Sequence, residues 1–198
     1  MEGLNLNNFV VYADGSVSSD NGGPDADGGI GWFVEGLCFG FGYVPLRCTN
    51  NISEMLAVMA GVNHLMHRHR ANQITFVSDS SYTVNGFMQW VDGWYRKDYR
   101  EVKNENLWRK AYDLKRRVHL IGKHVRGHGK AKEKEHVWPN AVVDHLAHLG
   151  RVSEKSRVVY IDDKIKDVLV RHRDFYLSNQ EAKARNVLFT SLKELQLV

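Results

Sequence analysis

The segment Phe9-Val10-Val11-Tyr12-Ala13-Asp14-Gly15-Ser16 sets the interpretation of this 198-residue chain, because it reads as a short strand that runs into a turn. Aromatic and β-branched residues favour strands, and the Asp-Gly pair that follows them favours a turn. Residues 30–35 and 37–44 predict two further strands, with a turn at Gly36 between them. Three successive strands with short turns indicate an antiparallel meander.

Helices and strands alternate after this meander. Apolar side chains recur at helical spacing across residues 51–68, with residues 49–51 as candidate caps. We expect strands at 74–78 and 118–125, and helices at 80–94, 105–117 and 139–149. This order predicts an α/β fold in which a mixed five-stranded sheet, with three antiparallel strands followed by parallel strands, is covered by helices.

The last part of the chain predicts a helical extension over residues 151–198, after one domain over residues 1–150. Two apolar helix faces are expected there, made by Ile161, Ile165, Val168, Leu169, His172 and Tyr176 and by Val187, Leu188, Leu192 and Leu195. Residues 178–181 have the form of a capping box at the start of the second helix. The two faces must be buried, either on the domain, in a dimer or partner contact, or against nucleic acid.

Charge is unevenly distributed along the chain. Residues 1–95 carry 3 basic and 9 acidic side chains, whereas residues 96–134 carry 14 basic and 5 acidic ones. The pattern is typical either of a solvated charged helix or of a polyanion-binding region beside a site that gathers carboxylates. The sequence predicts no membrane span and no secretory signal, and two cysteines make no disulfide framework, so we expect a cytoplasmic location.

Four acids occupy positions from which they can converge. Asp14 and Asp79 each end a predicted strand, whereas Glu54 and Asp144 lie on predicted helices. Clustered carboxylates repel one another and attract a counterion, and Mg²⁺ prefers such oxygen ligands. Two such ions about 3.5–4 Å apart can activate water and neutralise the leaving oxygen in phosphodiester cleavage. Taken singly, each acid has another interpretation: a turn for Asp14, a capping box with Asn51 for Glu54, an N-cap region for Asp79 and a solvated helix residue for Asp144.

The four acids lie within a series of sequence motifs that follow one another along the chain. The motifs are Tyr12-Ala13-Asp14-Gly15-Ser16, Thr49-Asn50-Asn51-Ile52-Ser53-Glu54, Ser78-Asp79-Ser80-Ser81-Tyr82, Gln89-Trp90-Val91-Asp92-Gly93-Trp94, Val102-Lys103-Asn104-Glu105-Asn106-Leu107-Trp108, Val125-Arg126-Gly127-His128 and Asn140-Ala141-Val142-Val143-Asp144. Across residues 9–150 the chain resembles the type 1 ribonuclease H family. The resemblance implies a ribonuclease H-like fold and endonucleolytic hydrolysis of the RNA strand of RNA/DNA hybrids by two metal ions.

The resemblance also implies roles for the catalytic residues. Asp14, Glu54, Asp79 and Asp144 would bind two Mg²⁺ ions, for which Mn²⁺ can substitute, and Asp14 would bridge both ions. Asp144 would help to hold the ion that activates water, and Glu54 and Asp79 the other. His128 would assist proton handling and product release.

Substrate contacts are implied in the same way. Arg47, Thr49 and Asn104 would grip a DNA phosphate, and Asn50 and Asn51 would touch the minor groove of the hybrid. Trp90 would pack on DNA sugars, with core packing as its alternative. Residues 96–103 resemble a short form of the family's basic, hybrid-binding protrusion.

Three features depart from the family pattern: a long segment between His128 and Asp144, Ala141 where the family often has Glu, and the extension. Two other functions remain open, a non-catalytic module that binds RNA/DNA hybrids and a related metal-dependent DNA nuclease. Retention of the four acids and His128 favours the enzyme. The residues that match Arg47, Thr49, Asn104 and Trp90 favour the hybrid as substrate.

Overall fold

The computed structural model describes residues 8–19, 22–45, 47–127 and 134–198, and in this part of the chain a six-stranded sheet of order β5-β4-β1-β2-β3-β6 forms the centre. Its strands are β1 (Asn8–Val17), β2 (Gly28–Val34), β3 (Cys38–Val44), β4 (Gln73–Ser78), β5 (His119–His124) and β6 (Arg157–Tyr160). β1, β2 and β3 form an antiparallel meander, and β4 and β5 add in parallel on the other side of β1. The predicted mixed sheet is therefore confirmed.

The strand count is a correction, because the described residues give six strands where we predicted five. β6 comes from the extension and pairs antiparallel with β3, from Cys38 opposite Tyr160 to Phe41 opposite Arg157. This edge strand has four residues, of which Val159 alone is buried. So short a segment gives only a weak strand pattern, which is why the sequence predicts a wholly helical extension.

The helices follow the predicted order, with differences at their ends. They are α1 (Asn50–His69), α2 (Ser81–Asn85), the π-helix η1 (Gly86–Trp90), α3 (Val91–Arg96), α4 (Glu105–Lys115), the 3₁₀-helix η2 (Lys134–His136), α5 (Val137–Ser153), α6 (Asp163–Leu177) and α7 (Glu181–Glu194). The single helix expected over residues 80–94 is thus three consecutive segments, and the π-helix begins at Gly86. Within the described residues, no helix is long and apolar enough to cross a bilayer.

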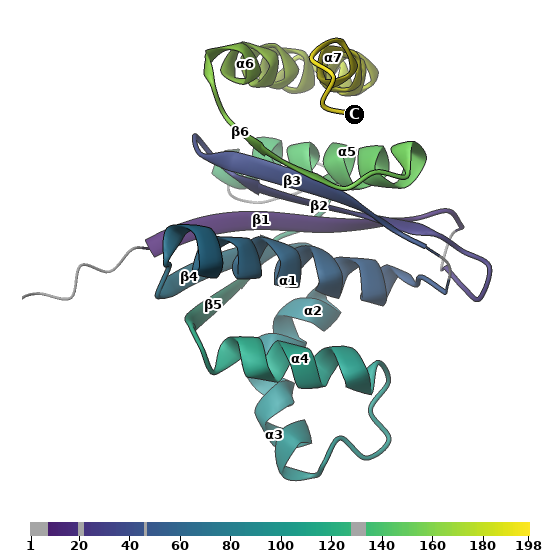
Figure 1. Ribbon diagram of the computed structural model, residues 1–198, viewed down its shortest axis with the longest axis vertical. Helices are drawn as coiled ribbons and strands as arrows, with labels where there is room; N and C mark the ends of the chain where they lie inside the picture. Colours follow the sequence, from purple (N-terminus) through teal and green to yellow (C-terminus); the bar gives the residue numbers. More distant parts are fainter. Residues whose placement is uncertain (1–7, 20–21, 46, 128–133) are drawn as a thin grey trace, which may run out of the picture.

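The sheet separates two cores. Along β1, Val11 and Ala13 face the core that α1 covers, whereas Tyr12 faces the core shared with α5. This alternation is the two-residue period of a strand buried on both faces. Figure 1 shows α1 and α2–α4 on one side of the sheet, α5 on the other, and α6 and α7 outside α5.

The extension packs on the rest of the chain through its apolar side chains. Ile165, Val168 and Leu169 of α6 and Leu188 and Leu192 of α7 are buried in the same core as the α5 side chains. The expected capping box at residues 178–181 is wrong. α7 begins after Gln180, whose side chain makes no capping hydrogen bond, and the Ser178 hydroxyl donates instead to the Asp174 carbonyl at 2.8 Å.

Candidate active site

Three of the predicted acids meet at the end of β1. The parallel register pairs Tyr12 with Val77, and two residues further along it Asp14 and Asp79 reach the same edge of the sheet. Glu54 reaches this edge from α1, and carboxylate oxygens of the three acids all lie within 4.8 Å of one another.

Gly15 permits the close approach that brings Glu54 to Asp14. A Cβ atom at Gly15 would lie 2.4 Å from Ser53 Oγ and 2.5 Å from the Glu54 backbone nitrogen, so any larger residue would push α1 away from β1. The N-cap of α1 is Thr49, whose hydroxyl accepts a hydrogen bond from the Ile52 backbone N–H at 3.3 Å. The alternative in which Asn51 and Glu54 form a capping box is therefore wrong, and the Glu54 carboxylate faces the other acids.

Burial makes this cluster electrostatically costly. Desolvation raises the pKa of Asp14 well above its ordinary value, and the charges of Asp79 and Asp144 raise it further. Burial likewise raises the pKa of Glu54, followed by the charges of Asp14 and Asp79. Asp14 Oδ1 accepts a hydrogen bond from the Gly15 N–H at 2.7 Å, whereas Glu54 Oε2 is buried and has no hydrogen-bond partner within the described residues. A proton or a cation would relieve this repulsion.

Asp144 joins the cluster from the opposite side of the sheet. It lies on α5 and lines one cavity together with Asp14, Asp79, Asn140, Ala141, Tyr176 and Glu181. The structure thus brings all four predicted acids around one site. Tyr176 and Glu181 were not foreseen as site residues, because only the packing of α6 and α7 on α5 carries them there.

His128 itself lies outside the described residues, whereas the preceding residue, Gly127, is described. Gly127 lies against Asp79, since a Cβ atom there would be 2.1 Å from Asp79 Oδ2. His124 Nε2 lies 3.0 Å from the Asp79 carbonyl oxygen, to which it can donate in the appropriate tautomer. The chain therefore enters the His128 segment beside the acids, and the role of His128 stays a prediction.

The residues predicted to contact substrate form two groups along the sequence. Arg47, Asn50 and Asn51 are exposed at or before the start of α1, where Thr49 uses its hydroxyl as the N-cap. The other two residues, Asn104 and Trp90, both lie against Tyr82.

Tyr82 is the centre of this second group. Asn104 Nδ2 donates to the Tyr82 hydroxyl at 3.5 Å, and Trp108 Nε1 donates to the same oxygen at 2.8 Å. The Trp90 ring centroid lies 6.2 Å from that of Tyr82, and Trp90 is 37% exposed. Trp90 is therefore not a fully buried core residue, and much of its surface is open to a ligand.

The basic segment at residues 96–103 is anchored on one side. The Tyr99 side chain is buried, and the Arg109 guanidinium lies 4.5 Å from the centre of its ring. Arg109 also pairs with Asp98 at 2.8 Å. The basic side chains of the segment remain exposed: Arg96, Lys97, Arg100 and Lys103.

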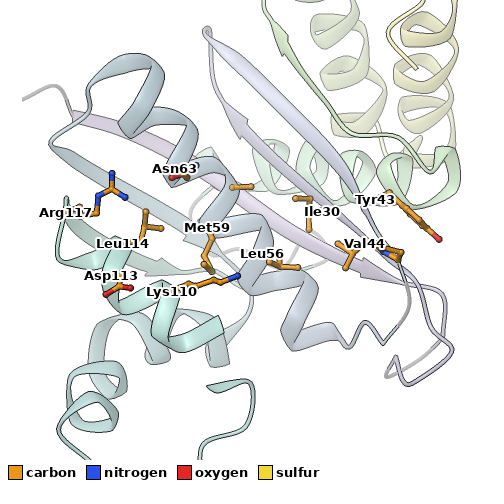
Figure 2. A pocket seen from close by; sticks show the side chains of 12 residues that line it. Ile30, Tyr43, Val44, Leu56, Met59, Asn63, Lys110, Asp113, Leu114 and Arg117 are labelled. Carbon is orange, nitrogen blue, oxygen red and sulfur yellow. The ribbon is translucent and has the colours of Figure 1, made fainter. Parts of the chain in front are cut away.

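A second cavity lies away from the acids, between α1, α4 and the ends of β2 and β3. Figure 2 shows Lys110, Asp113 and Leu114 of α4 near Leu56 and Met59 of α1. Its remaining lining residues are Ile30, Tyr43, Val44, Pro45, Ala60, Asn63 and Arg117. None of the four predicted acids lines it, so this mainly apolar cavity is separate from the carboxylate site.

Comparison with known proteins gives one consistent family. The family model described as RNase H matches residues 7–151. A Ribonuclease H of Cereibacter sphaeroides (strain ATCC 17025 / ATH 2.4.3) is 30% identical over 166 residues, which cover 77% of this chain and all of that protein. A Ribonuclease H of Acidovorax sp. (strain JS42) is 33% identical over 157 residues, which cover 74% of this chain and all of that protein.

A solved structure shows the same fold. The crystal structure of LC9-RNase H1, described as a type 1 RNase H with the type 2 active-site motif, superposes with a TM-score of 0.66 at 23% sequence identity. The match covers 78% of this chain and 77% of the other. The predicted fold class is therefore confirmed.

Proposed function

The chain belongs to the ribonuclease H family of enzymes, and we propose that it cleaves the RNA strand of RNA/DNA hybrids endonucleolytically with two Mg²⁺ ions. The observation that carries this proposal is the convergence of Asp14, Glu54 and Asp79 within 4.8 Å, with Asp144 on the same cavity. Clustered, buried carboxylates destabilise a fold unless they are neutralised. A protein that only binds hybrids would have no use for such a cluster, which favours the enzyme over the non-catalytic module.

The donor set fits hard divalent cations. It is made of carboxylate oxygens, and the buried Glu54 Oε2 lacks a hydrogen-bond partner within the described residues. Mg²⁺ prefers oxygen ligands and retains several waters, and Mn²⁺ can substitute. The bound ions would neutralise phosphate charge and make water a better nucleophile.

The chain's own residues would divide the work around this site. Asp14 shares a cluster with Glu54 and Asp79 and a cavity with Asp144, so it is the residue placed to serve both ions. His128, two residues beyond Arg126 in a segment that starts beside Asp79, would move protons and help to release product. Asp144 would serve the ion on the water-activating side.

Binding of the hybrid would use the surface around the site. Arg47, Thr49 and Asn104 would hold a DNA phosphate, and Asn50 and Asn51 would contact the minor groove, where the RNA 2′-hydroxyl lies. Trp90 would pack on DNA sugars, for which its exposed ring is available. The exposed cations of residues 96–103 would add affinity that does not depend on sequence and weakens with salt.

A cytoplasmic location is part of the proposal. Cys38 and Cys48 are both buried free thiols in the described part of the chain. Reduced cysteines are usual in the cytosol, where a hybrid substrate would also be accessible.

The experiment that tests the function compares substrates. End-labelled RNA/DNA hybrid is incubated with the protein beside matched RNA/RNA, DNA/DNA and single-stranded RNA, each with Mg²⁺ or with EDTA. We expect internal cuts in the RNA of the hybrid, only with Mg²⁺. Equal or faster cutting of duplex DNA would instead support the metal-dependent DNA nuclease, and binding of the hybrid without cutting would support the non-catalytic module.

A further inference from the structure

The extension forms one edge of the carboxylate cavity. Tyr176 at the end of α6 and Glu181 at the start of α7 line the cavity that also contains Asp14, Asp79 and Asp144. Carboxylate oxygens of Asp144 and Glu181 lie within 4.8 Å of each other. Two like charges so close repel one another, and a cation between them would remove the repulsion.

A hydrogen-bond chain behind these acids fixes the proton on His145. Trp138 Nε1–H donates to His172 Nδ1 at 3.0 Å, so His172 Nδ1 is an acceptor and its proton is on Nε2. His172 Nε2–H then donates to His145 Nδ1 at 2.9 Å. His145 therefore carries its proton on Nε2. The indole N–H of Trp138, which can only donate, thus makes His145 Nε2 a donor rather than a metal ligand.

This donor is buried and lies beside Glu181. The His145 side chain is 2% exposed, and its Nε2 has no hydrogen-bond partner within the described residues. The carboxylate next to it is Glu181, whose Oε1 lies 3.9 Å away. A shift of about 1 Å would bring Glu181 within hydrogen-bond distance. A buried N–H donor with no other hydrogen-bond partner among the described residues therefore lies next to the Glu181 carboxylate.

An unpaired acceptor also lines the cavity. Asn140 is 6% exposed, and its Oδ1 has no hydrogen-bond partner among the described residues. A hydrated divalent cation carries water donors that can satisfy such an oxygen. The cavity thus offers a cation two carboxylates from the α5–α7 side and a neutral oxygen acceptor.

We propose that Glu181 is a fifth carboxylate of the active site, supplied by the extension, and that it attracts a divalent cation, Mg²⁺ or Mn²⁺, beside Asp144. Glu181 acts through the waters of the ion, and His145 is a positioning residue that holds the Glu181 carboxylate. The inference rests on the proposed function only in that the cavity is the one assigned to hydrolysis. The competing explanation is that Glu181 merely stabilises the N-terminus of α7, as acidic residues there often do.

The test replaces one carboxylate and measures metal binding directly. Glu181→Gln is compared with Glu194→Gln, which makes the same charge change at the other end of α7. Free Mn²⁺ is followed by electron paramagnetic resonance during a titration, and the rise in melting temperature with Mg²⁺ is measured in parallel. We expect Glu181→Gln to weaken one Mn²⁺ site about 10-fold and to reduce the Mg²⁺-induced rise in melting temperature. Glu194→Gln should bind like the unmodified protein.

The same variants distinguish the failures. Equal Mn²⁺ affinity in Glu181→Gln and Glu194→Gln would overturn the inference, and a lower metal-free melting temperature of Glu181→Gln with unchanged affinity would assign Glu181 to helix stability alone. If the unmodified protein does not cut hybrids but Glu181→Gln weakens Mn²⁺ binding, the proposed function fails and the cation site stands.

The positioning role of His145 has its own readout. His145→Leu removes the donor and should weaken the same Mn²⁺ site, with no further loss when Glu181→Gln is added. His145→Gln keeps an N–H donor and should recover part of the affinity. A His145→Leu protein that is folded and binds Mn²⁺ normally would contradict the positioning role.

Discussion

The two sides of the carboxylate cavity are built differently. On the sheet side, Asp14, Glu54 and Asp79 come from β1, α1 and the end of β4, and burial raises the pKa values of Asp14 and Glu54. On the helix side, Asp144 is half-buried and Glu181 is exposed, and neutral side chains behind them form a directed hydrogen-bond chain. The sheet-side acids are buried, so their repulsion is strong and a cation would relieve it. The repulsion between Asp144 and Glu181 is better screened by solvent, because Glu181 is exposed.

The largest effect is expected from removing the charge of Asp14, which clusters with Glu54 and Asp79 and lines the same cavity as Asp144. Asp14→Asn should abolish nearly all hydrolysis, because metal ions contribute several kcal/mol to such transition states and each 1.4 kcal/mol corresponds to about tenfold in rate. Single-turnover cleavage of the hybrid measures this loss. Substantial Mg²⁺-dependent turnover in Asp14→Asn would contradict the central role of Asp14.

The same substitution should stabilise the metal-free protein. Because the folded-state pKa of Asp14 lies above its unfolded value, folding takes up a proton between the two values, and the contribution of Asp14 to stability falls as the pH rises through that range. Asparagine does not titrate, so the variant does not carry this penalty at pH 7. Thermal melting in EDTA should therefore give a higher melting temperature for Asp14→Asn than for the unmodified protein. Asp25→Asn, in an exposed loop, is the control and should not show the gain.

An intermediate effect is expected for the histidine that the resemblance places beside the sheet-side acids. His128→Ala should slow steady-state turnover about 10²-fold without abolishing it, which is the scale of general acid–base assistance. If His128 acts mainly in product release, the single-turnover rate should fall less than the steady-state rate. Unchanged rates in both regimes would move this role to another residue, with His124 and His136 as the next candidates.

Lowering the pH should destabilise the fold through His145 and His172 on the helix side. Burial lowers the pKa of His145 to about 3 and that of His172 to about 4. Both values lie below the unfolded value of about 6.5, so the unfolded chain binds more protons as the pH falls. The stability that the neutral histidines provide is therefore complete above pH 6.5 and is lost as the pH drops toward the folded-state values.

The corresponding measurement uses a variant that cannot titrate at this position. Between pH 7 and pH 5 the free energy of unfolding of the unmodified protein should fall by about 2 kcal/mol more than that of His172→Gln. Urea unfolding at both pH values gives this difference. The comparison between the two proteins is needed because the raised pKa values of Asp14 and Glu54 make their contribution to stability change in the opposite direction as the pH falls. Parallel pH profiles would show that the histidine chain does not titrate on unfolding.

The sheet side could be predicted from sequence because each acid follows a local signal. Asp14 and Asp79 end β-rich runs, and the parallel pairing of those runs brings them together. Thr49 was among the candidate caps, and the cap fixes where α1 starts and so where Glu54 lies.

The helix side could be predicted only in part. Asp144 was predicted and lines the cavity, whereas the position of Glu181 depends on packing between distant helices. Glu181 reaches the cavity only through the packing of α6 and α7 on α5, and Ser178 to Glu181 suggested a capping box that does not form. β6 was not predicted for a related reason. Its only buried residue is Val159, and the strand is recognisable only from its pairing with β3, which is distant in the sequence.

The most direct test is the dependence of the single-turnover hydrolysis rate on Mg²⁺ concentration. The protein is in excess over the RNA/DNA hybrid, at a concentration above the dissociation constant of their complex. If two ions act in the carboxylate cavity, the logarithm of the rate should rise with a slope of about two against the logarithm of Mg²⁺ concentration at the low end of the titration. A slope of one throughout the titration, or no cleavage at any Mg²⁺ concentration, would contradict a two-ion hydrolase at this site.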